Sequence, residues 1–374
     1  MNDKSLNLFC PIGHTGYGIT SLNIAKALYY YKLDLYLFPI GKNISPNSEE
    51  EKKFCLSLIE KSHNFPYYAP SLKIWHQFDL ATSIGKGHYY AYPFFELDSF
   101  PKNEIHMMNY TDFIFTTSKW AKNILLNNGV KKPIYIAPLG VDTSIFRSPP
   151  KIKFESDNYV FFNIGKFEKR KSQEFLIEAF GKAFSPLDNV ELRLIPQFEV
   201  LQDSQKKELD EAINNSPLKD KIKLYNRLPT QYDVANFIWS ADCGLYLSRA
   251  EGWNNEILET MALNKPVIVS DYSAHTEYCT SKNSFLVKID ELEVANDGVW
   301  FHGNGGKWAK LGQNQLDQTV EHMRYVYNNN IKLNPEGVNT AQNYSWLNTG
   351  KIIYDTLSTN GSFYANPKKK KRRR

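Results

Sequence analysis

Residues 248–277, which follow an apolar run at 243–247, form the stretch that most constrains the fold of this 374-residue chain. An apolar run at 243–247 predicts a buried strand, and a second apolar run begins at 267–269. Between them, a loop containing Glu251 leads into a segment with one apolar face, which is typical of a helix. Strand, loop, helix and strand in this order indicate a parallel α/β unit whose loop meets a helix N-terminus. The free backbone N–H groups at such an end attract phosphate.

Two carboxylates accompany this helix N-terminus: Glu251 in the loop and Glu259 in the helix, in an E-x7-E pattern. An ionised carboxylate only accepts hydrogen bonds, so it would repel a phosphate but bind the hydroxyls of a sugar. The combination predicts a ligand that has both parts, a diphosphate carrying sugars. The alternative interpretation is two solvated helix carboxylates with no ligand.

The residues around this pair, EGW at 251–253 and LETMALNKPVIVS at 258–270, resemble the donor-binding signature of glycosyltransferase family 4. This family, also called glycosyl transferases group 1, consists of retaining enzymes with the α/β GT-B fold. In that fold two Rossmann-like domains face each other across an interdomain cleft. The resemblance implies that Glu259 binds the nucleotide ribose and that Glu251 contacts the transferred sugar.

The same resemblance implies roles for the loop between the two carboxylates. Gly252, Trp253 and Asn254 would place backbone amides against the sugar and the phosphates. The family usually has Gly and Pro where this chain has Asn254 and Glu256. The departure concerns the local backbone path and the selection of the sugar.

A basic turn, GKFEKRKSQEF at 165–175, follows the predicted strand at 160–164. The family has an Arg and a Lys here that reach the donor diphosphate; this chain has Lys166 and Lys171 at those places. Arg170 lies beside them and is a further candidate for binding the diphosphate, because its planar guanidinium could supply the bidentate contact that Lys166 lacks. Positive side chains at a helix start oppose its dipole, at a cost of about 0.3–1 kcal/mol each. A bound anion would offset that cost, since a charge-assisted hydrogen bond contributes about 1.5–3 kcal/mol. A solvated basic turn is the alternative.

A glycine-rich turn at 13–18 follows the first predicted strand and precedes a helical pattern at 19–31, as in a Rossmann-like βαβ unit. Glycines at a strand-to-helix turn allow the backbone to approach a ligand closely. The spacing is not the GxGxxG of dinucleotide enzymes. The resemblance implies that Gly16 and Gly18 lie near the donor phosphates and the acceptor, and a purely structural turn is the alternative.

Glu96 follows a predicted strand at 89–95, and ligands collect at the carboxyl ends of strands in open α/β sheets. Family members often carry a His in this region, close to the reacting centre. Here the matching segment has Glu96 instead, while His76 and His88 lie elsewhere in the sequence. We expect Glu96 at the reacting centre, with a local hydrogen-bonding role as the alternative.

Alternating strand and helix patterns, and a length that fits two ordinary domains, predict two α/β domains. PLGVDTSIF at 138–146 matches the segment that closes the first domain in the family, and WFHGNGG at 300–306 is expected to be a loop. The predicted parts are an acceptor domain at 1–148 completed by a crossover helix at about 344–358, a donor domain at 156–343, and a flexible basic tail at 359–374.

The implied reaction is sugar transfer from a nucleotide-diphosphate sugar to a saccharide, lipid-linked or other hydroxyl acceptor, with retention of anomeric configuration. No two Asp residues lie two positions apart, so the chain lacks the Asp-x-Asp motif that holds a metal in many transferases. We therefore expect no metal and no cofactor. Lys166, Lys171 and the helix N-termini would neutralise the leaving diphosphate. The predicted catalytic residues are Glu251, Lys171 and Glu96.

The remaining composition bears on location and partners. No apolar run approaches the ~20 residues of a membrane span, no signal peptide is visible, and the four scattered cysteines are typical of a reduced, cytoplasmic protein. Lys368–Arg374 is an unbroken basic run that accounts for the whole formal charge of +5, so the rest of the chain is slightly acidic. This tail predicts peripheral contact with an anionic membrane or polymer.

Two other functions remain open from the sequence. The same fold could support a sugar-nucleotide epimerase or a phosphorylase-like enzyme, since a fold does not fix a reaction. The chain could also be a non-catalytic binding protein that its basic tail recruits to nucleic acid or to a membrane, and the tail could be a cloning remnant.

Overall fold

The computed structural model describes residues 4–41, 44–46, 48–147, 157–198 and 202–364. Contacts divide the chain into two compact units. Unit 1 contains the chain up to Phe95, Phe100–Gly140 and the part from Tyr344 onward, and unit 2 contains Glu96–Ser99 and Val141–Asn343. The basic run at 368–374, for which we predict peripheral binding, lies outside the described residues.

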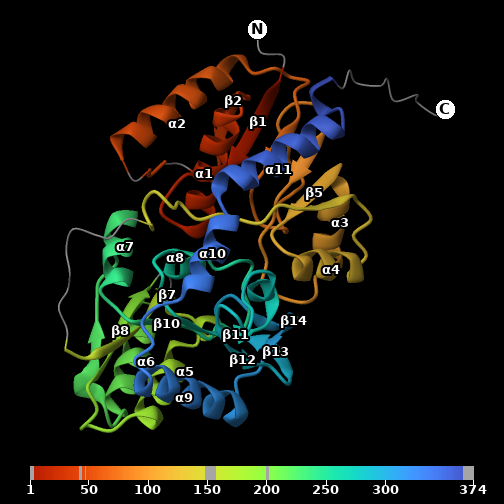
Figure 1. The fold of residues 1–374 in the computed structure, drawn as a ribbon. Coiled ribbons are helices and arrows are strands. Elements are labelled where there is room, and N and C mark those ends of the chain that lie inside the picture. Colours follow the sequence, from red (N-terminus) through yellow and green to blue (C-terminus); the bar gives the residue numbers. More distant parts are fainter. Residues whose placement is uncertain (1–3, 42–43, 47, 148–156, 199–201, 365–374) are drawn as a thin grey trace. The chain divides into compact units, whose positions relative to one another are not determined.

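Unit 1 is a six-stranded parallel sheet with helices (Figure 1). The strand order β2-β1-β3-β4-β5-β6 is that of a Rossmann-like sheet. Its elements are β1 (Ser5–Cys10), α1 (Gly16–Tyr30), β2 (Asp34–Pro39), α2 (Glu49–Lys61), β3 (Ser71–Lys73), β4 (Tyr89–Ala91), α3 (Lys102–Tyr110), β5 (Phe113–Thr116), α4 (Lys119–Asn127), β6 (Ile134–Ile136) and α11 (Trp346–Thr359).

The last helix, α11, comes from the far end of the sequence and packs against α1, as Figure 1 also shows. Gly350 of α11 makes this close approach possible, because a Cβ there would lie 2.6 Å from the Cβ of Ala27. Thr349 donates a hydrogen bond to the carbonyl of Pro138 (2.6 Å). Unit 1 is therefore built from both ends of the chain.

Unit 2 is a second six-stranded parallel sheet, with the order β12-β11-β10-β7-β8-β9, and a separate antiparallel hairpin. Its elements are β7 (Tyr159–Lys166), α5 (Gln173–Ala183), β8 (Val190–Gln197), α6 (Gln202–Asn214), β9 (Ile222–Leu224), α7 (Gln231–Trp239), β10 (Cys243–Tyr246), α8 (Asn255–Ala262), β11 (Val267–Asp271), β12 (Phe285–Lys288), β13 (Leu292–Asn296), β14 (His302–Ala309), α9 (Gln313–Asn328) and α10 (Pro335–Asn343).

The core of unit 2 explains why its central strands read as continuous apolar runs. β10 is buried along its whole length, and Leu245 joins Phe161 of β7, Ile268 of β11 and Leu176 of α5 in one hydrophobic cluster. Strands of a parallel sheet covered on both faces need apolar side chains at successive positions. The expected fold class, two Rossmann-like α/β domains with parallel sheets, is confirmed.

One expected loop is wrong. Residues 302–309 form strand β14, which pairs antiparallel with β13. Three glycines in this segment hid the strand pattern, because glycine is depleted in strands. The hairpin has a small core of its own, in which the buried Trp308 packs with Ala295 and Ala250.

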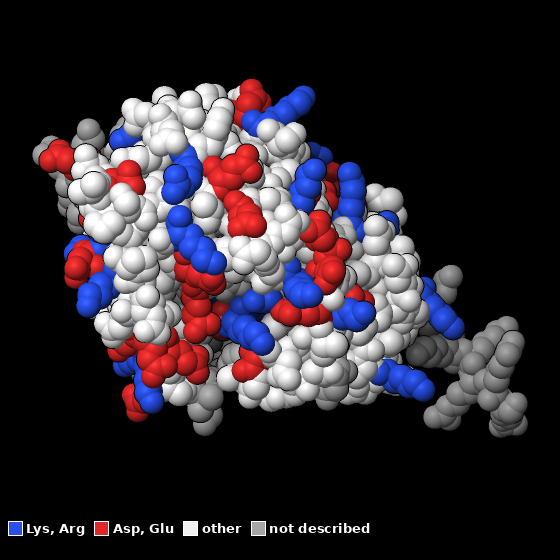
Figure 2. Space-filling view, turned by 90° about the horizontal axis from the view of Figure 1, so that it is seen from below, with Lys and Arg blue, Asp and Glu red and all other residues white. Residues whose placement is uncertain are grey.

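The described residues also show the state of the cysteines and the distribution of charge on one face of the protein. All four cysteines are buried and free. Across the described parts of the chain, no helix is long and apolar enough to cross a membrane. On the face that Figure 2 presents, acidic and basic side chains are interspersed, which agrees with a nearly neutral body.

Candidate active site

The turn between β7 and α5 presents the basic residues that the sequence singles out. Lys169–Lys171 form a short 3-10 turn, and Ser172 then takes a left-handed conformation (φ 58°) that starts α5. The stem of Lys171 lies over Gly165, where an added Cβ would sit 3.6 Å from the Lys171 Cδ. The turn thereby directs its second and third basic residues toward the loop that follows β10.

That loop brings a buried carboxylate to both cations. Glu251 is 5% exposed, and its carboxylate lies 2.8 Å from Arg170 Nη1 and 2.6 Å from Lys171 Nζ. Burial alone would raise the pKa of Glu251, but Arg170 and Lys171 outweigh burial and hold this pKa well below its usual range. The Glu251 carboxylate is thus ionised, and Lys171, whose pKa is raised by Glu251 despite burial, is protonated.

Arg170 is held by more than one partner. Its guanidinium also lies 3.1 Å from the Glu168 carboxylate and donates to the Ala250 carbonyl at 2.9 Å. The side chain therefore ties the β7–α5 turn to the β10 loop. Lys166 is more open: its side chain is 36% exposed and its Nζ is 3.9 Å from the Glu168 carboxylate.

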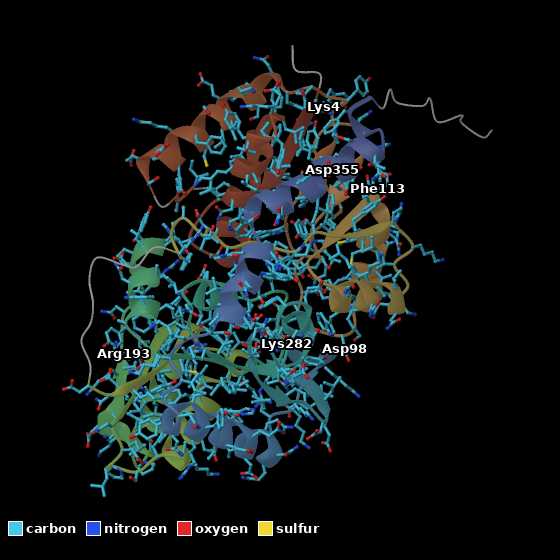
Figure 3. The ribbon with its side chains drawn as sticks, viewed as in Figure 1. Lys4, Asp98, Phe113, Arg193, Lys282 and Asp355 are labelled. Atoms are coloured by element: carbon cyan, nitrogen blue, oxygen red, sulfur yellow. The ribbon has the colours of Figure 1, made fainter. Side chains whose placement is uncertain are left out.

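Glu96 begins a four-residue segment, Glu96–Ser99, that belongs to unit 2, although the chain on either side of this segment belongs to unit 1. Burial is the largest influence on its carboxyl and raises its pKa, while nearby Arg170 opposes the rise and Glu251 adds to it. The segment is fixed two residues later, where Asp98 accepts a hydrogen bond from the backbone N–H of Lys307 in β14 (2.7 Å; Asp98 is labelled in Figure 3). The structure thus brings Glu96, Glu251, Arg170 and Lys171 into one electrostatic cluster.

The loop before α8 has an unusual backbone. Asn254 adopts φ 78° and ψ 83°, a left-handed region that Asn tolerates better than most residues. The Tyr278 hydroxyl donates to the carbonyls of Trp253 (2.8 Å) and Asn254 (2.9 Å), which fixes this shape. The structure thus gives a reason for Asn where the family usually has Gly.

A neutral histidine forms a hydrogen bond with the side chain of Asn254 in the same loop. Burial lowers the pKa of His275 to about 4, so its ring is neutral at pH 7. His275 Nδ1 lies 3.1 Å from the Ser270 carbonyl and Nε2 lies 3.3 Å from Asn254 Nδ2. We assign the Nδ1–H tautomer, because the carbonyl can only accept and the amide nitrogen can only donate.

This arrangement leaves the Asn254 side chain with a spare acceptor. Asn254 is 7% exposed, and its Oδ1 has no hydrogen-bond partner among the described residues. The Oδ1 of Asn255, at the first position of α8, is in the same condition. Buried acceptors without partners are costly, so a ligand with hydroxyl or N–H donors would match the N-terminus of α8.

Glu259 lies one turn further into α8 and is separate from the ion pairs around Glu251. Burial raises its pKa well above the usual value, and the nearby Glu256 adds to the rise. Within the described part of the chain its carboxylate has no salt bridge or hydrogen bond.

Gly16 and Gly18 lie in unit 1, apart from the other predicted donor-binding residues in the division of the chain. Gly18 has a structural reason: an added Cβ would lie 2.4 Å from the backbone nitrogen of Gly13. An added Cβ at Gly16 would meet nothing within 4 Å, so the space beside it is open. Thr15 caps α1 by accepting from the Gly18 N–H (3.4 Å).

Several supporting residues were missed from sequence. Glu168, His275, Tyr278 and Asp98 hold the cluster and its loop, yet none was singled out. Glu168 sits two positions before Arg170, which gave a weak signal; the others act across distances in sequence that no local pattern reveals. Among the described residues, no group of three or more His, Cys, Asp or Glu side chains is placed to hold a metal ion.

Comparison with known proteins shows which family and which fold this chain resembles. A family model described as Glycosyl transferases group 1 matches residues 144–299. An uncharacterized glycosyltransferase of Methanocaldococcus jannaschii is 32% identical over 115 residues, which cover 31% of this chain and 26% of that protein. EpsD of Bacillus subtilis, named as a glycosyltransferase, is 25% identical over 241 residues, which cover 58% of this chain and 61% of EpsD. The match therefore spans about a quarter of the length of the first relative and about three fifths of the length of EpsD.

Solved structures share the fold over nearly the whole chain. Sucrose-phosphate synthase from Thermosynechococcus elongatus has a TM-score of 0.72 at 12% identity, covering 96% of this chain and 99% of its own. HepE from Anabaena, solved with UDP-glucose, has a TM-score of 0.68 at 16% identity, covering 95% and 99%. The chain has the fold of GT-B glycosyltransferases, and the sequence at 144–299 is similar to the family of glycosyl transferases group 1. The family match supports the expectation of an enzyme of the glycosyltransferase class.

Proposed function

We propose that the protein is a family 4-type glycosyltransferase that moves a sugar from a nucleotide-diphosphate sugar to an acceptor hydroxyl, in the synthesis of a glycan or glycoconjugate. The observation that carries this proposal is the Arg170–Glu251–Lys171 ion-pair cluster beside the N-terminus of α8, inside the matched domain. HepE, a neighbour in fold, was solved with UDP-glucose, which supports a nucleotide-sugar donor.

The donor's charged part would meet the basic turn. Lys166 and Lys171 and the N–H groups at the start of α8 would stabilise the diphosphate as negative charge builds on it. Arg170 is a positioning residue in this scheme, because Glu168, Glu251 and the Ala250 carbonyl already hold its guanidinium. In unit 1, Gly16 and Gly18 would contribute a backbone surface toward the phosphates and the acceptor.

The hydroxyl groups of the donor would donate hydrogen bonds to acceptor atoms of the protein. Glu251 would accept from the transferred sugar and Glu259 from the ribose. The loop of Gly252, Trp253 and Asn254 would line the sugar, and the unpaired Asn254 Oδ1 supplies a further acceptor for one of its hydroxyls. A diphosphate that draws Lys171 toward itself would free one oxygen of Glu251 for this role.

Glu96 would handle the proton of the acceptor hydroxyl. Burial raises the pKa of its carboxyl, which makes the carboxylate a better base than an exposed one. Its neighbours Arg170 and Lys171 oppose this rise of the pKa. We propose that Glu96 accepts this proton as the new glycosidic bond forms.

A donor screen tests the function. UDP-, GDP- and ADP-glucose are compared by thermal shift, and the stabilising donors are then assayed for nucleotide diphosphate release with sugar acceptors. Transfer that fails in Glu251→Gln but survives in Glu178→Gln, an exposed carboxylate on α5, supports the site. Conversion of the donor into an isomeric sugar nucleotide without transfer would favour the epimerase alternative, and nucleotide binding with no turnover would favour a binding protein.

Two finer features of the reaction belong to the same proposal. Retention is tested by NMR of the product's anomeric proton, with the donor's configuration as reference. Independence from metal is tested by turnover in excess EDTA, where we expect an unchanged rate, because Lys171 and α8 supply the positive charge. Complete loss of activity with EDTA and its return with a divalent cation would contradict the second feature.

The location is also a proposal. We infer that the protein works in the cytoplasm and that Lys368–Arg374 holds it loosely to an anionic membrane or polymer. The concentration of positive charge in this one segment supports the idea, because the remaining chain is slightly acidic.

A further inference from the structure

Unit 2 contains a pocket of about 240 Å³ that is separate from the ion-pair cluster around Glu251. The β7–α5 turn, helices α5 and α6, and the β13–β14 hairpin form its walls. The Glu168–Lys169 side of the turn faces this pocket, whereas Arg170 and Lys171 bind Glu251. No role in the proposed transfer reaction uses its lining residues on α6 or the hairpin.

Two carboxylates from different helices line this pocket without partners. Glu174 of α5 and Glu208 of α6 have no salt bridge or side-chain hydrogen bond to any other described residue. Burial raises the pKa of Glu174 and repulsion by Glu208 adds to the rise, while the more weakly acting Arg249 and Lys169 oppose it; the two carboxylates therefore lie close enough to interact unfavourably. A cation between them would relieve that repulsion.

Two buried amide oxygens add to the set of acceptors. Gln173, which is 1% exposed, and Gln205 both line the pocket, and the Oε1 of each is buried with no partner among the described residues. Their amide nitrogens are already engaged: Gln173 Nε2 donates to Asn163 Oδ1 at 2.8 Å and Gln205 Nε2 donates to the Phe167 carbonyl at 2.8 Å.

The positive groups of the lining are engaged as well. Lys169 Nζ donates to the Asn296 carbonyl at 3.0 Å, and the guanidinium of Arg249 binds Glu293 and the Lys169 carbonyl. The pocket therefore offers spare acceptors and negative charge, while these donors are bound within the protein. A ligand that only donates matches this set better than a sugar hydroxyl, which both donates and accepts.

An exposed aromatic ring completes the lining. Trp300, in the turn of the hairpin, is 52% exposed and borders the same pocket. Its backbone is fixed by Asp297, whose Oδ1 accepts from the N–H of Trp300 (2.8 Å) and of Phe301 (2.9 Å). A tryptophan face attracts organic cations through its π electrons.

We propose that this pocket binds an organic ammonium ion, either an alkylamine or an amino sugar with a free amino group, between Glu174 and Glu208 and against the ring of Trp300. The ammonium group donates to the two carboxylates and the amide oxygens of Gln173 and Gln205. The carbon skeleton of the ligand lies against Trp300. This site is independent of the proposed transfer reaction.

NMR titration of the full-length protein tests the proposal. The indole N–H signal of Trp300 is assigned from its disappearance in Trp300→Phe and followed with propylammonium chloride, glucosamine hydrochloride and glucose, at constant ionic strength. We expect both ammonium probes to shift this signal in a saturable way and glucose to leave it unchanged. A response to glucosamine alone would identify an amino sugar as the ligand, and equal responses would identify the ammonium group as sufficient.

Matched variants locate the binding. Glu174→Gln/Glu208→Gln should weaken binding of the responding probe at least tenfold. Glu178→Gln/Glu211→Gln changes the same charge on the same two helices at exposed positions, and it should change binding less than twofold. If the first double variant does not fold, as judged by its melting transition, Trp300→Ala replaces it and binding is followed by calorimetry. Equal shifts with glucose and glucosamine, no response to any probe, or unchanged binding in the variants would each overturn the proposal.

Discussion

At the scale of single residues, the chemistry of the site rests on competition for Lys171. Its ammonium lies 2.6 Å from Glu251 in the structure, and a donor diphosphate would present a stronger anion to the same group. Arg170, held from three sides, would keep Glu251 ionised and in place when Lys171 turns toward phosphate. Arg170 would thus hold Glu251 while Lys171 binds the diphosphate, and a single cation could not perform both tasks together.

Replacing Lys171 tests this division. We expect Lys171→Ala to lower kcat by roughly 10²–10³-fold, the usual effect of removing one preorganised charge-stabilising donor. The KM for the donor should change much less, since Lys166 and α8 remain. Steady-state kinetics measure both, with Lys182→Ala, an exposed lysine on α5, as the control. A kcat equal to that of the unchanged protein would remove Lys171 from the mechanism.

Replacing Glu259 tests whether this residue binds the ribose of the nucleotide. Its partly buried carboxylate has no described partner, so it is available to two vicinal hydroxyls. Loss of two hydrogen bonds costs about 0.5–1.5 kcal/mol each, so Glu259→Ala should weaken binding of the free nucleotide by about fivefold to a hundredfold in calorimetry. Glu178→Ala, which removes an exposed carboxylate on α5, is the control. Equal affinities for the two variants would place the ribose elsewhere.

The neutral ring of His275 predicts a dependence of stability on pH. Burial lowers its pKa from 6.5 to about 4, so between these values the unfolded chain binds a proton that the folded protein does not. Stability therefore rises with pH across this window, and the free energy of unfolding should fall by about 3 kcal/mol from this ring on going from pH 7 to pH 4.

Urea unfolding at several pH values measures this effect. His275→Gln should show a shallower fall of stability with decreasing pH than the unchanged protein, because it removes the group that titrates. His106→Gln, an exposed histidine on α3, should keep the full slope. Identical slopes for all three proteins would mean that folding does not lower the pKa of His275.

How far the candidate site follows from sequence depends on the range of the interactions. Glu251 and Lys171 stand in a local pattern, so both could be named before their contact was known. Their direct ion pair could not, because 80 residues and several elements separate them in sequence. The same limit hid the ring of His275, whose role depends on the left-handed backbone of Asn254.

At the scale of elements, the buried central strands can be predicted from the sequence, whereas the helices and the hairpin that bury few residues cannot. The central strands of unit 2 are buried on both faces, so their apolar runs are unmistakable. Helices α2 and α3 escaped prediction because each buries few residues: Cys55 and Leu58 in the first, Met108 in the second. The β13–β14 hairpin escaped because its glycines and polar residues read as a loop.

Two glycines of α1 provide a test at this scale. Gly18→Ala would force a Cβ to within 2.4 Å of the Gly13 backbone, so we expect a loss of about 1–3 kcal/mol in the free energy of unfolding, as for an overpacked core. Gly16→Ala meets open space, and alanine favours a helix over glycine, so stability should be unchanged or slightly higher. Chemical denaturation measures both.

The same two substitutions also distinguish a ligand-binding role of the glycine-rich turn from a structural role. If Gly16 allows a ligand to approach the backbone, Gly16→Ala should reduce activity while leaving stability intact. A stable and fully active Gly16→Ala would reduce the glycine-rich turn to a structural feature. Equal destabilisation by both substitutions would contradict the close approach at Gly18.

At the scale of the whole molecule, charge is distributed unevenly along the chain. The last seven residues are all Lys or Arg, while the rest is slightly acidic. Deleting 368–374 should leave turnover of a water-soluble acceptor within twofold. It should also abolish binding to vesicles that contain phosphatidylserine, a binding that in the full chain should weaken steeply with salt.

Vesicle sedimentation at 50 and 200 mM salt measures this behaviour, with neutral phosphatidylcholine vesicles as the control. Binding of the full chain to both kinds of vesicle alike would exclude an electrostatic attachment. Loss of turnover on deletion would give the tail a part in catalysis that we do not propose.

The assignment of Glu96–Ser99 to unit 2 has a consequence for dissecting the protein genetically. A gene fragment that encodes only 141–343 would yield a polypeptide without Glu96 and without the Asp98 acceptor that Lys307 uses. Supplying the missing tetrapeptide in trans would carry a large entropic penalty, since a short free peptide must be immobilised. Truncation studies of nucleotide affinity should therefore graft 96–99 by a linker, or they will measure an incomplete binding surface.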